Sequence, residues 1–112
     1  MAAISNTAVT GATTTTIDSF DMSLGKGAVW RYVVDEGPGT NMRVGIIQAV
    51  WDNAAGGNIE YMPDDHSDDI GTTFGVVSFA VVKSASTIQL KATSTGGTWD
   101  IHVVRTIIGA SY

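Results

Sequence analysis

Residues 69–109 read DIGTTFGVVSFAVVKSASTIQLKATSTGGTWDIHVVRTIIG, and this stretch decides the fold class. Two short turn-forming segments, 83–86 and 95–98, separate three β-rich runs. Each run has a length suited to one strand and alternates in polarity. The stretch therefore predicts an antiparallel meander with one buried face and one solvated face.

The rest of the chain extends the same pattern, because no apolar period of 3.6 residues persists over three turns. The other expected strands cover 17–22, 29–36, 42–52 and 59–62. These make seven strands, or eight if the Thr-rich run 13–16 pairs with a neighbour. The pattern predicts an all-β chain folded as an antiparallel, jelly-roll-like β-sandwich.

The chain is expected to divide into an N-terminal arm, residues 1–16, and a β-sandwich domain, residues 17–112. The arm is Ala- and Thr-rich and carries no charged residue, so it cannot form a core of its own. The domain is therefore expected to fold without residues 2–12, which would instead lie along a neighbouring subunit.

The alternation of apolar and polar residues along the strands predicts which residues form the core, and it shows two arginines on otherwise apolar faces. Both faces of 42–52 are largely apolar, which predicts a central strand buried on two sides. Arg43 and Arg105 interrupt apolar faces, so we expect each to be structural or to lie at a subunit contact. The expected core is Trp30, Val44, Ile46, Trp51, Phe79, Leu90, Trp99, Ile101 and Val103. The expected interface is Thr13, Thr14, Thr15, Thr16, Arg43 and Arg105.

The amino-acid composition limits the classes of partner and compartment that this chain is expected to have. Charged residues make up 15% of the 112 residues, against about 25% in an average domain, and the net charge is −5. The six Lys and Arg are scattered, so no basic groove for nucleic acid is expected. There is no cysteine for a disulfide or a thiolate metal site, and neither a signal peptide nor a membrane span is expected. These features indicate a soluble protein made in the cytoplasm.

Catalytic and metal-binding patterns are weak. The segment 64–69 holds four Asp and one His, which favours a solvated loop but leaves Ca²⁺ binding open. His66 and His102 lack an accompanying G-x-S-x-G elbow, and Glu36 with Glu60 is a pair that any small domain contains by chance. We therefore predict no enzyme activity and no cofactor.

Three stretches carry a resemblance to small bacteriophage virion proteins and to the terminal modules of phage fibres: NMRVGIIQAVWD (41–52), DDIGTTFGVVSFAVV (68–82) and TIQLKATSTGGTWDIHVVRTII (87–108). In those modules a strand ending in Trp, here Trp51, precedes a Tyr-bearing strand, here with Tyr61. A D-I-G-x-T turn follows, here beginning at Asp69, and a final hairpin runs from Leu90 to Trp99.

The resemblance implies a structural virion protein on the outer surface of the capsid, made in the host cytoplasm. It would be a decoration (cement) or short head-fibre protein that binds the major capsid protein or another virion protein. Such proteins commonly form closed oligomers, so a homotrimer is expected. The alternative is a tail-fibre tip or receptor-binding module that recognises a host surface glycan.

Overall fold

The protein is all-β and antiparallel. The computed structural model describes residues 2–36, 40–53, 58–68, 70–73 and 76–109, with the side chains of 2–5 and 63–64 left aside. The strands in these residues are β1 (Ala2–Asp21), β2 (Gly27–Glu36), β3 (Asn41–Trp51), β4 (Ile59–His66), β5 (Val77–Ser84) and β6 (Thr87–Ile108). The only helix in this part of the chain is a 3-10 turn, η1 (Met22–Leu24), so no helix there is long and apolar enough to cross a membrane.

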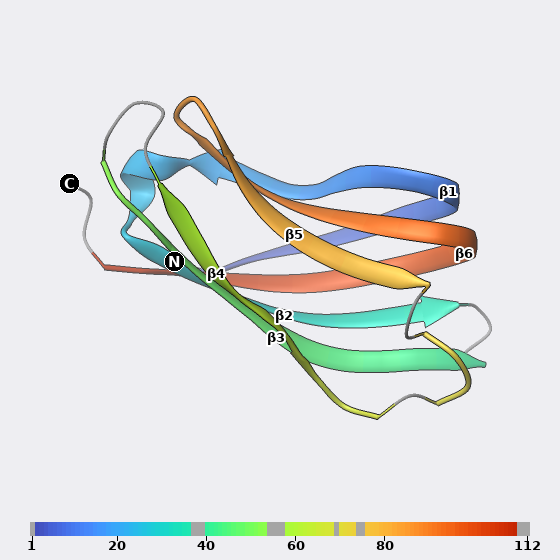
Figure 1. Ribbon diagram of the computed structural model, residues 1–112. Coiled ribbons are helices and arrows are strands. Elements are labelled where there is room, and N and C mark those ends of the chain that lie inside the picture. Colours follow the sequence, from blue (N-terminus) through green and yellow to red (C-terminus); the bar gives the residue numbers. More distant parts are fainter. Residues whose placement is uncertain (1, 37–39, 54–57, 69, 74–75, 110–112) are drawn as a thin grey trace.

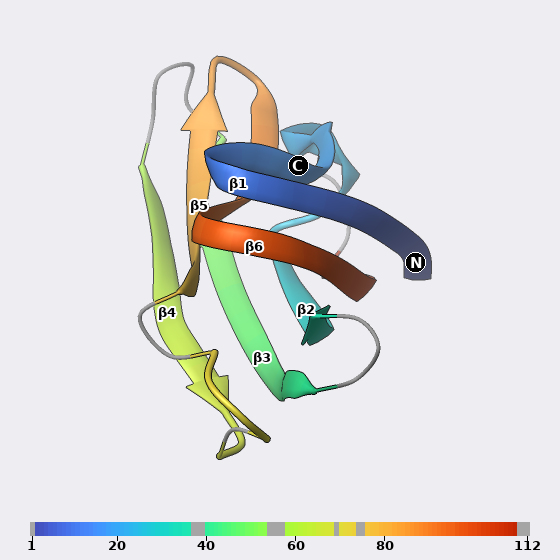
Figure 2. The same ribbon diagram turned by 90° about the vertical axis from the view of Figure 1, so that its right-hand side faces the viewer.

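β6 organises the sandwich because it runs through both of its layers (Figure 1). In the larger layer the order is β1-β6-β2-β3-β4, and in the smaller layer the first part of β6 lies between β1 and β5. Figure 2 shows β1 and β6 curving together from one layer into the other. The alternating apolar residues of both layers meet between them and form one core.

The expected hairpin turn at 95–98 is wrong, since β6 continues through it. The register passes from Thr10↔Thr98 to Ala12↔Thr95, so the two residues Gly96 and Gly97 lie opposite the single residue Gly11. Gly11 and Gly97 have φ values of 75° and 86°, and such glycine bulges bend paired strands without reversing them. The last two strands of the predicted meander are therefore one bent strand, β6, and the described residues form six strands where seven or eight were expected.

The boundary expected between residues 16 and 17 falls inside β1. This strand pairs with β6 from Ala2↔Thr106 to Asp21↔Thr87, and Val9 is buried in the core. The Thr- and Ala-rich segment has enough β propensity to pair once β6 offers it an edge. Residues 2–16 are therefore a strand of the sandwich in this structure, where an arm was expected.

The chain passes from β1 to β2 through η1. Asp21 caps this turn, because its Oδ1 accepts a hydrogen bond from the Ser23 amide at 2.8 Å, and this bond lowers the pKa of Asp21 below its usual value. The indole N–H of Trp51 donates to the carbonyl oxygens of Met22 and Gly25 at 2.9 and 3.1 Å. The Trp51 side chain thus holds the connection against the end of β3.

The core lies between the two layers and contains all three tryptophans. Trp30, Trp51 and Trp99 are each at most 4% exposed. Of the nine residues expected in the core, six are buried: Trp30, Trp51, Leu90, Trp99, Ile101 and Val103. Phe79 is partly buried and packs against Tyr32, with 4.5 Å between the ring centroids.

Candidate functional site

Arg43 lies inside the sandwich and joins its layers. It is 4% exposed, and from β3 its Nε donates to the Tyr32 hydroxyl at 2.9 Å. Its two terminal nitrogens donate to Thr73 Oγ1 at 3.3 Å and to the Val77 carbonyl oxygen, at the start of β5, at 3.1 Å. A Cβ at Gly45 would clash with the Tyr32 ring, so the glycine makes room for this arrangement. Arg43 is therefore a structural residue and not an exposed interface residue.

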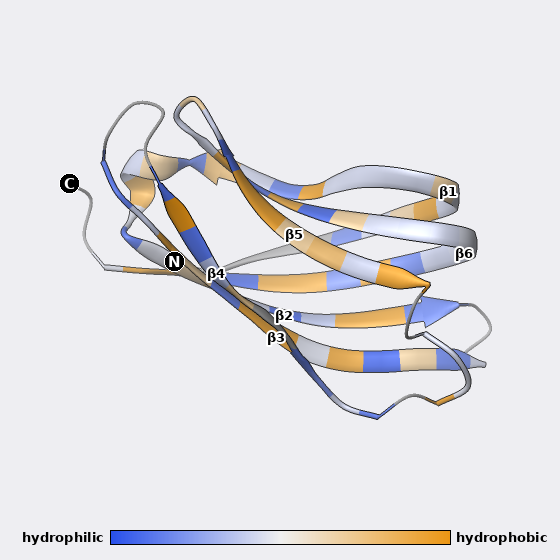
Figure 3. Cartoon of the chain, in the orientation of Figure 1, coloured by the Kyte–Doolittle hydropathy of each residue, from blue (hydrophilic) through white to orange (hydrophobic). Residues whose placement is uncertain are grey.

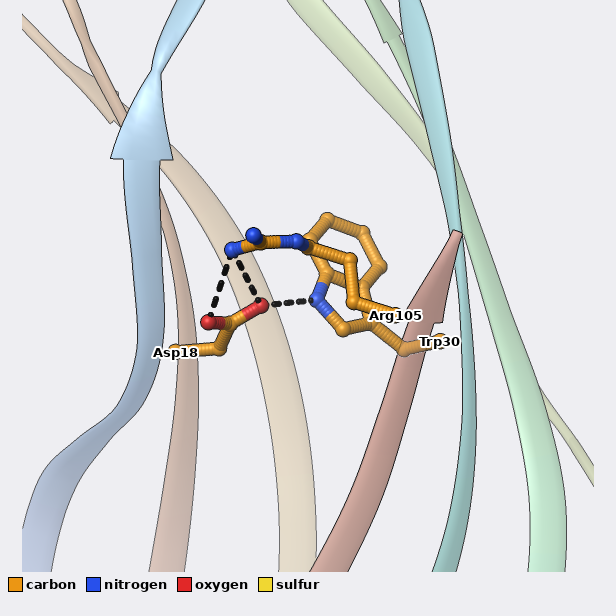
Figure 4. A network of polar contacts seen from close by, with 3 residues as sticks. All are labelled: Asp18, Trp30 and Arg105. Atoms are coloured by element: carbon orange, nitrogen blue, oxygen red, sulfur yellow. Dashed lines mark hydrogen bonds and ion pairs between the residues drawn. The ribbon is translucent and has the colours of Figure 1, made fainter. Parts of the chain in front are cut away.

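Arg105 also reaches across the core, where it meets Asp18 (Figure 4). Its Nη1 lies 3.0 and 3.2 Å from the two carboxylate oxygens of Asp18, and Trp30 Nε1 donates to Asp18 Oδ2 at 2.8 Å. The guanidinium carbon lies 4.7 Å from the centroid of the Phe20 ring. Because both ends of the ion pair are mostly buried, this network fixes β1 to β2 and β6 and offers no surface for a partner.

The acidic segment continues the sheet where an irregular loop was expected. β4 extends through Asp65 to His66, and the Ser67 amide donates to the Val44 carbonyl at 2.8 Å. Asp65 and Asp68 are exposed, while Asp69 lies outside the described residues. Within the described ranges, no group of three or more His, Asp or Glu is placed to hold a metal ion.

The two histidines lie on different strands, His66 on β4 and His102 on β6. His102 is exposed on β6, and its Nδ1 lies 2.8 Å from Asn6 Oδ1 on β1. His66 is at the end of β4, with its Nδ1 2.9 Å from the Ser67 carbonyl oxygen. The described contacts of the two rings therefore do not link the histidines to each other.

The outer face of the larger layer is the surface that the sequence interpretation missed. Along β3, the residues that point into the sandwich are buried and those that point outward are exposed. Val44 and Ile46 were expected in the core but are 52% and 36% exposed. Val44 and Ile46 are exposed because β3 lies inside its sheet, but no second layer of the described residues covers its outward side.

Strand pairing gathers further apolar residues around Val44 and Ile46. Across the sheet, Val33 pairs with Val44, and Ile46 and Val104 flank Arg31 from β3 and β6. Other exposed apolar side chains of this sheet are Val50, Met62 and Ile108, with Ile70 beside the end of β3. We call this surface, centred on the exposed Arg31, the outer face.

The outer face is also hollowed. A groove of about 510 Å³ crosses the ends of β2, β3, β4 and β6. Its lining includes Val29, Gln48, Val50, Tyr61, Met62 and Ile108. The outer face thus combines exposed apolar side chains with the guanidinium of Arg31, and Lys26 and Glu60 also line its groove.

The bend at Gly11 divides β1 into a first limb, residues 2–10, and a second limb, residues 12–21. The four expected interface threonines lie on the second limb, in the smaller layer. Thr13, Thr14 and Thr16 are exposed and Thr15 is half-buried. Thr14 Oγ1 lies 2.9 Å from Thr93 Oγ1 on β6, so this hydroxyl already bridges two strands. Arg43 and Arg105 are buried inside the sandwich whereas three of the four threonines are exposed on β1, so the expected interface set does not form one surface.

The comparisons with known proteins add only a fold likeness. No family model matches the sequence, and no curated protein matches it. Among solved structures, a tailspike protein of Acinetobacter baumannii phage AM24 is similar, with a TM-score of 0.48 and 8% sequence identity. The match covers 93% of this chain and 25% of the tailspike, so the chain spans about a quarter of that protein.

Proposed function

We propose that this chain is a structural protein of a bacteriophage particle that decorates the capsid by packing its outer face against the major capsid protein. The observation that carries the proposal is the exposed apolar side of β3, where Val44 and Val50 are 52% and 61% exposed. A strand that is apolar on both sides but covered on one side is expected to bind another protein surface.

The chemistry of the outer face supports a protein partner. Arg31 has aliphatic neighbours on both adjacent strands, and an arginine in such surroundings is a frequent anchor of protein interfaces. The low charged fraction of the chain reduces the polar groups that binding must desolvate. We expect the complementary surface to be apolar with a carboxylate opposite Arg31.

A glycan-recognising fibre tip is less well supported. Sugar recognition by stacking needs exposed aromatic rings, but Trp30, Trp51 and Trp99 are in the core. Tyr61 is the only Trp, Tyr or Phe among the exposed large hydrophobic residues of the described chain. The capsid-decorating role therefore fits the outer face better than a receptor-binding role.

The test is binding to empty shells assembled from the major capsid protein of the virus that encodes this chain. Val44→Lys places a charge in the outer face, and Ser78→Lys is the matched control on exposed β5 in the smaller layer. We expect Val44→Lys to weaken co-sedimentation with shells about tenfold or more, with an unchanged melting temperature. Ser78→Lys should bind like the wild type.

Two results would contradict the proposal. One is full binding by Val44→Lys with loss of binding by Ser78→Lys, which would place the contact on the smaller layer. The other is absence of the chain from purified particles when their proteins are measured by mass spectrometry.

A further inference from the structure

One edge of the larger sheet has no partner strand in the part of the chain that the structure describes. Among the described strands β1 pairs with β6, so the other edge of its residues 2–10 presents a row of main-chain N–H and C=O groups. Natural sheets normally protect such edges with Lys, Pro, inward charges or a very short strand. Residues 2–10 of β1 lack these devices, since they contain no charged residue, no Pro and no β-bulge.

The opposite edge of the same sheet is protected. β4 has only eight residues and includes Pro63, which has no N–H to donate. Glu60 and Asp65 on this strand are exposed and carry like charges. In a ring of copies, the edge of β1 would pair with the edge of β4. The uncharged strand β1 would then face a short strand that lacks one N–H donor and carries like charges. The edge of β1 is better matched by a second β1.

The first limb of β1 suits self-pairing best. Its register with β6 is regular from Ala2↔Thr106 to Thr10↔Thr98, which gives nine residues without a bulge. The second limb contains a further irregularity between Thr16 and Asp18 and carries two aspartates. Two uncharged first limbs lying antiparallel bring no like charges opposite each other. Figure 3 shows β1 pale over much of its length, with short hydrophilic segments.

We propose that two copies of this chain associate by antiparallel pairing of their first β1 limbs, residues 2–10, around a two-fold axis near Asn6. Ala2 of each copy then lies opposite Thr10 of the other, and the two larger sheets become one continuous sheet. Such a pair gains about one main-chain hydrogen bond per paired residue. The two outer faces lie on the same side of the joined sheet. The inference does not depend on capsid binding, because the edge and the outer face use different atoms.

The first test measures mass by light scattering after size-exclusion chromatography. Asn6→Asp keeps the shape of the side chain and an acceptor for His102, but puts two carboxylates opposite each other across the axis. The matched control is Gln48→Glu, which adds the same charge on exposed β3. We expect the wild type and Gln48→Glu to be dimers, and Asn6→Asp to dissociate about fivefold more readily at low salt.

A wild-type protein that is monomeric or trimeric at about 100 μM, far above the Kd of a specific pair, would overturn this inference. So would a dimer that Gln48→Glu weakens and Asn6→Asp does not, because that result places the contact on the outer face.

The second test uses the absence of cysteine from the chain, so that each variant has one thiol. Directly opposed residues of antiparallel strands have Cα atoms about 4.5–5.5 Å apart, within the range for a disulfide. Asn6→Cys should therefore form a covalent dimer on mild oxidation. Ala8→Cys is the control in the same limb, since its two copies would be about 13 Å apart along the strand. If Ala8→Cys or Gln48→Cys cross-links as fast as Asn6→Cys, the proposed pairing is wrong.

Discussion

At the scale of single residues, the sandwich depends on polar side chains that cross its core. The Asp18 carboxylate accepts hydrogen bonds from Arg105 on β6 and Trp30 on β2, so one side chain of β1 holds two other strands. The sequence indicated that Arg105 is structural or lies at a subunit contact, but it did not identify Asp18. A carboxylate 87 positions away becomes its neighbour only through the long-range pairing of β1 with β6.

This network gives a stability prediction. Asp18→Asn keeps the side-chain volume but leaves the Arg105 guanidinium mostly buried without its counter-charge, so we expect a loss of about 3 kcal/mol in the free energy of unfolding. Urea unfolding followed by Trp fluorescence measures it. The double variant Asp18→Asn with Arg105→Met should recover much of the loss, because no buried charge remains. Equal losses in the single and double variants would show that the ion pair is not what stabilises this site.

At the scale of elements, the long strands β1 and β6 show which features of the fold the sequence predicts and which it does not. Alternating polarity correctly predicted that the chain is all-β and antiparallel. It did not distinguish a hairpin at 95–98 from a bend, because Gly-Gly between Thr residues is compatible with both. The difference lies in the partner: Gly11 of β1 faces Gly96 and Gly97, and the two strands bend together.

The continuity of β1 changes the expected effect of a truncation. Deleting residues 2–10 should destabilise the domain by about 3 kcal/mol or more, because it removes buried Val9 and uncovers the paired edge of β6. Thermal unfolding by circular dichroism measures the effect. As a milder comparison, Val9→Ala keeps the strand and should cost about 2 kcal/mol. A truncated protein with the wild-type melting temperature would restore the interpretation of this segment as a separate arm.

At the scale of the whole molecule, the outer face shows why a site can be present in a sequence and still be misassigned. The sequence correctly marks both sides of β3 as apolar, and it was natural to assign both to the core. Burial, however, depends on whether another layer exists, and the strands that the structure describes cover only one side of β3. We propose that another molecule covers the second apolar side. Edge pairing would place two such sides together on one surface.

The two proposed contacts predict opposite behaviour for two variants. A paired molecule presents two outer faces to the shell, so the second contact forms at a high effective concentration. At protein concentrations near the dissociation constant of the pair, Asn6→Asp should therefore bind shells about fivefold more weakly than the wild type, although Arg31, Val44 and Ile46 are unchanged. Val44→Lys should stay dimeric by light scattering and lose shell binding. If Asn6→Asp is mostly monomeric yet binds shells as tightly as the wild type, the single chain is the binding unit and pairing serves another purpose.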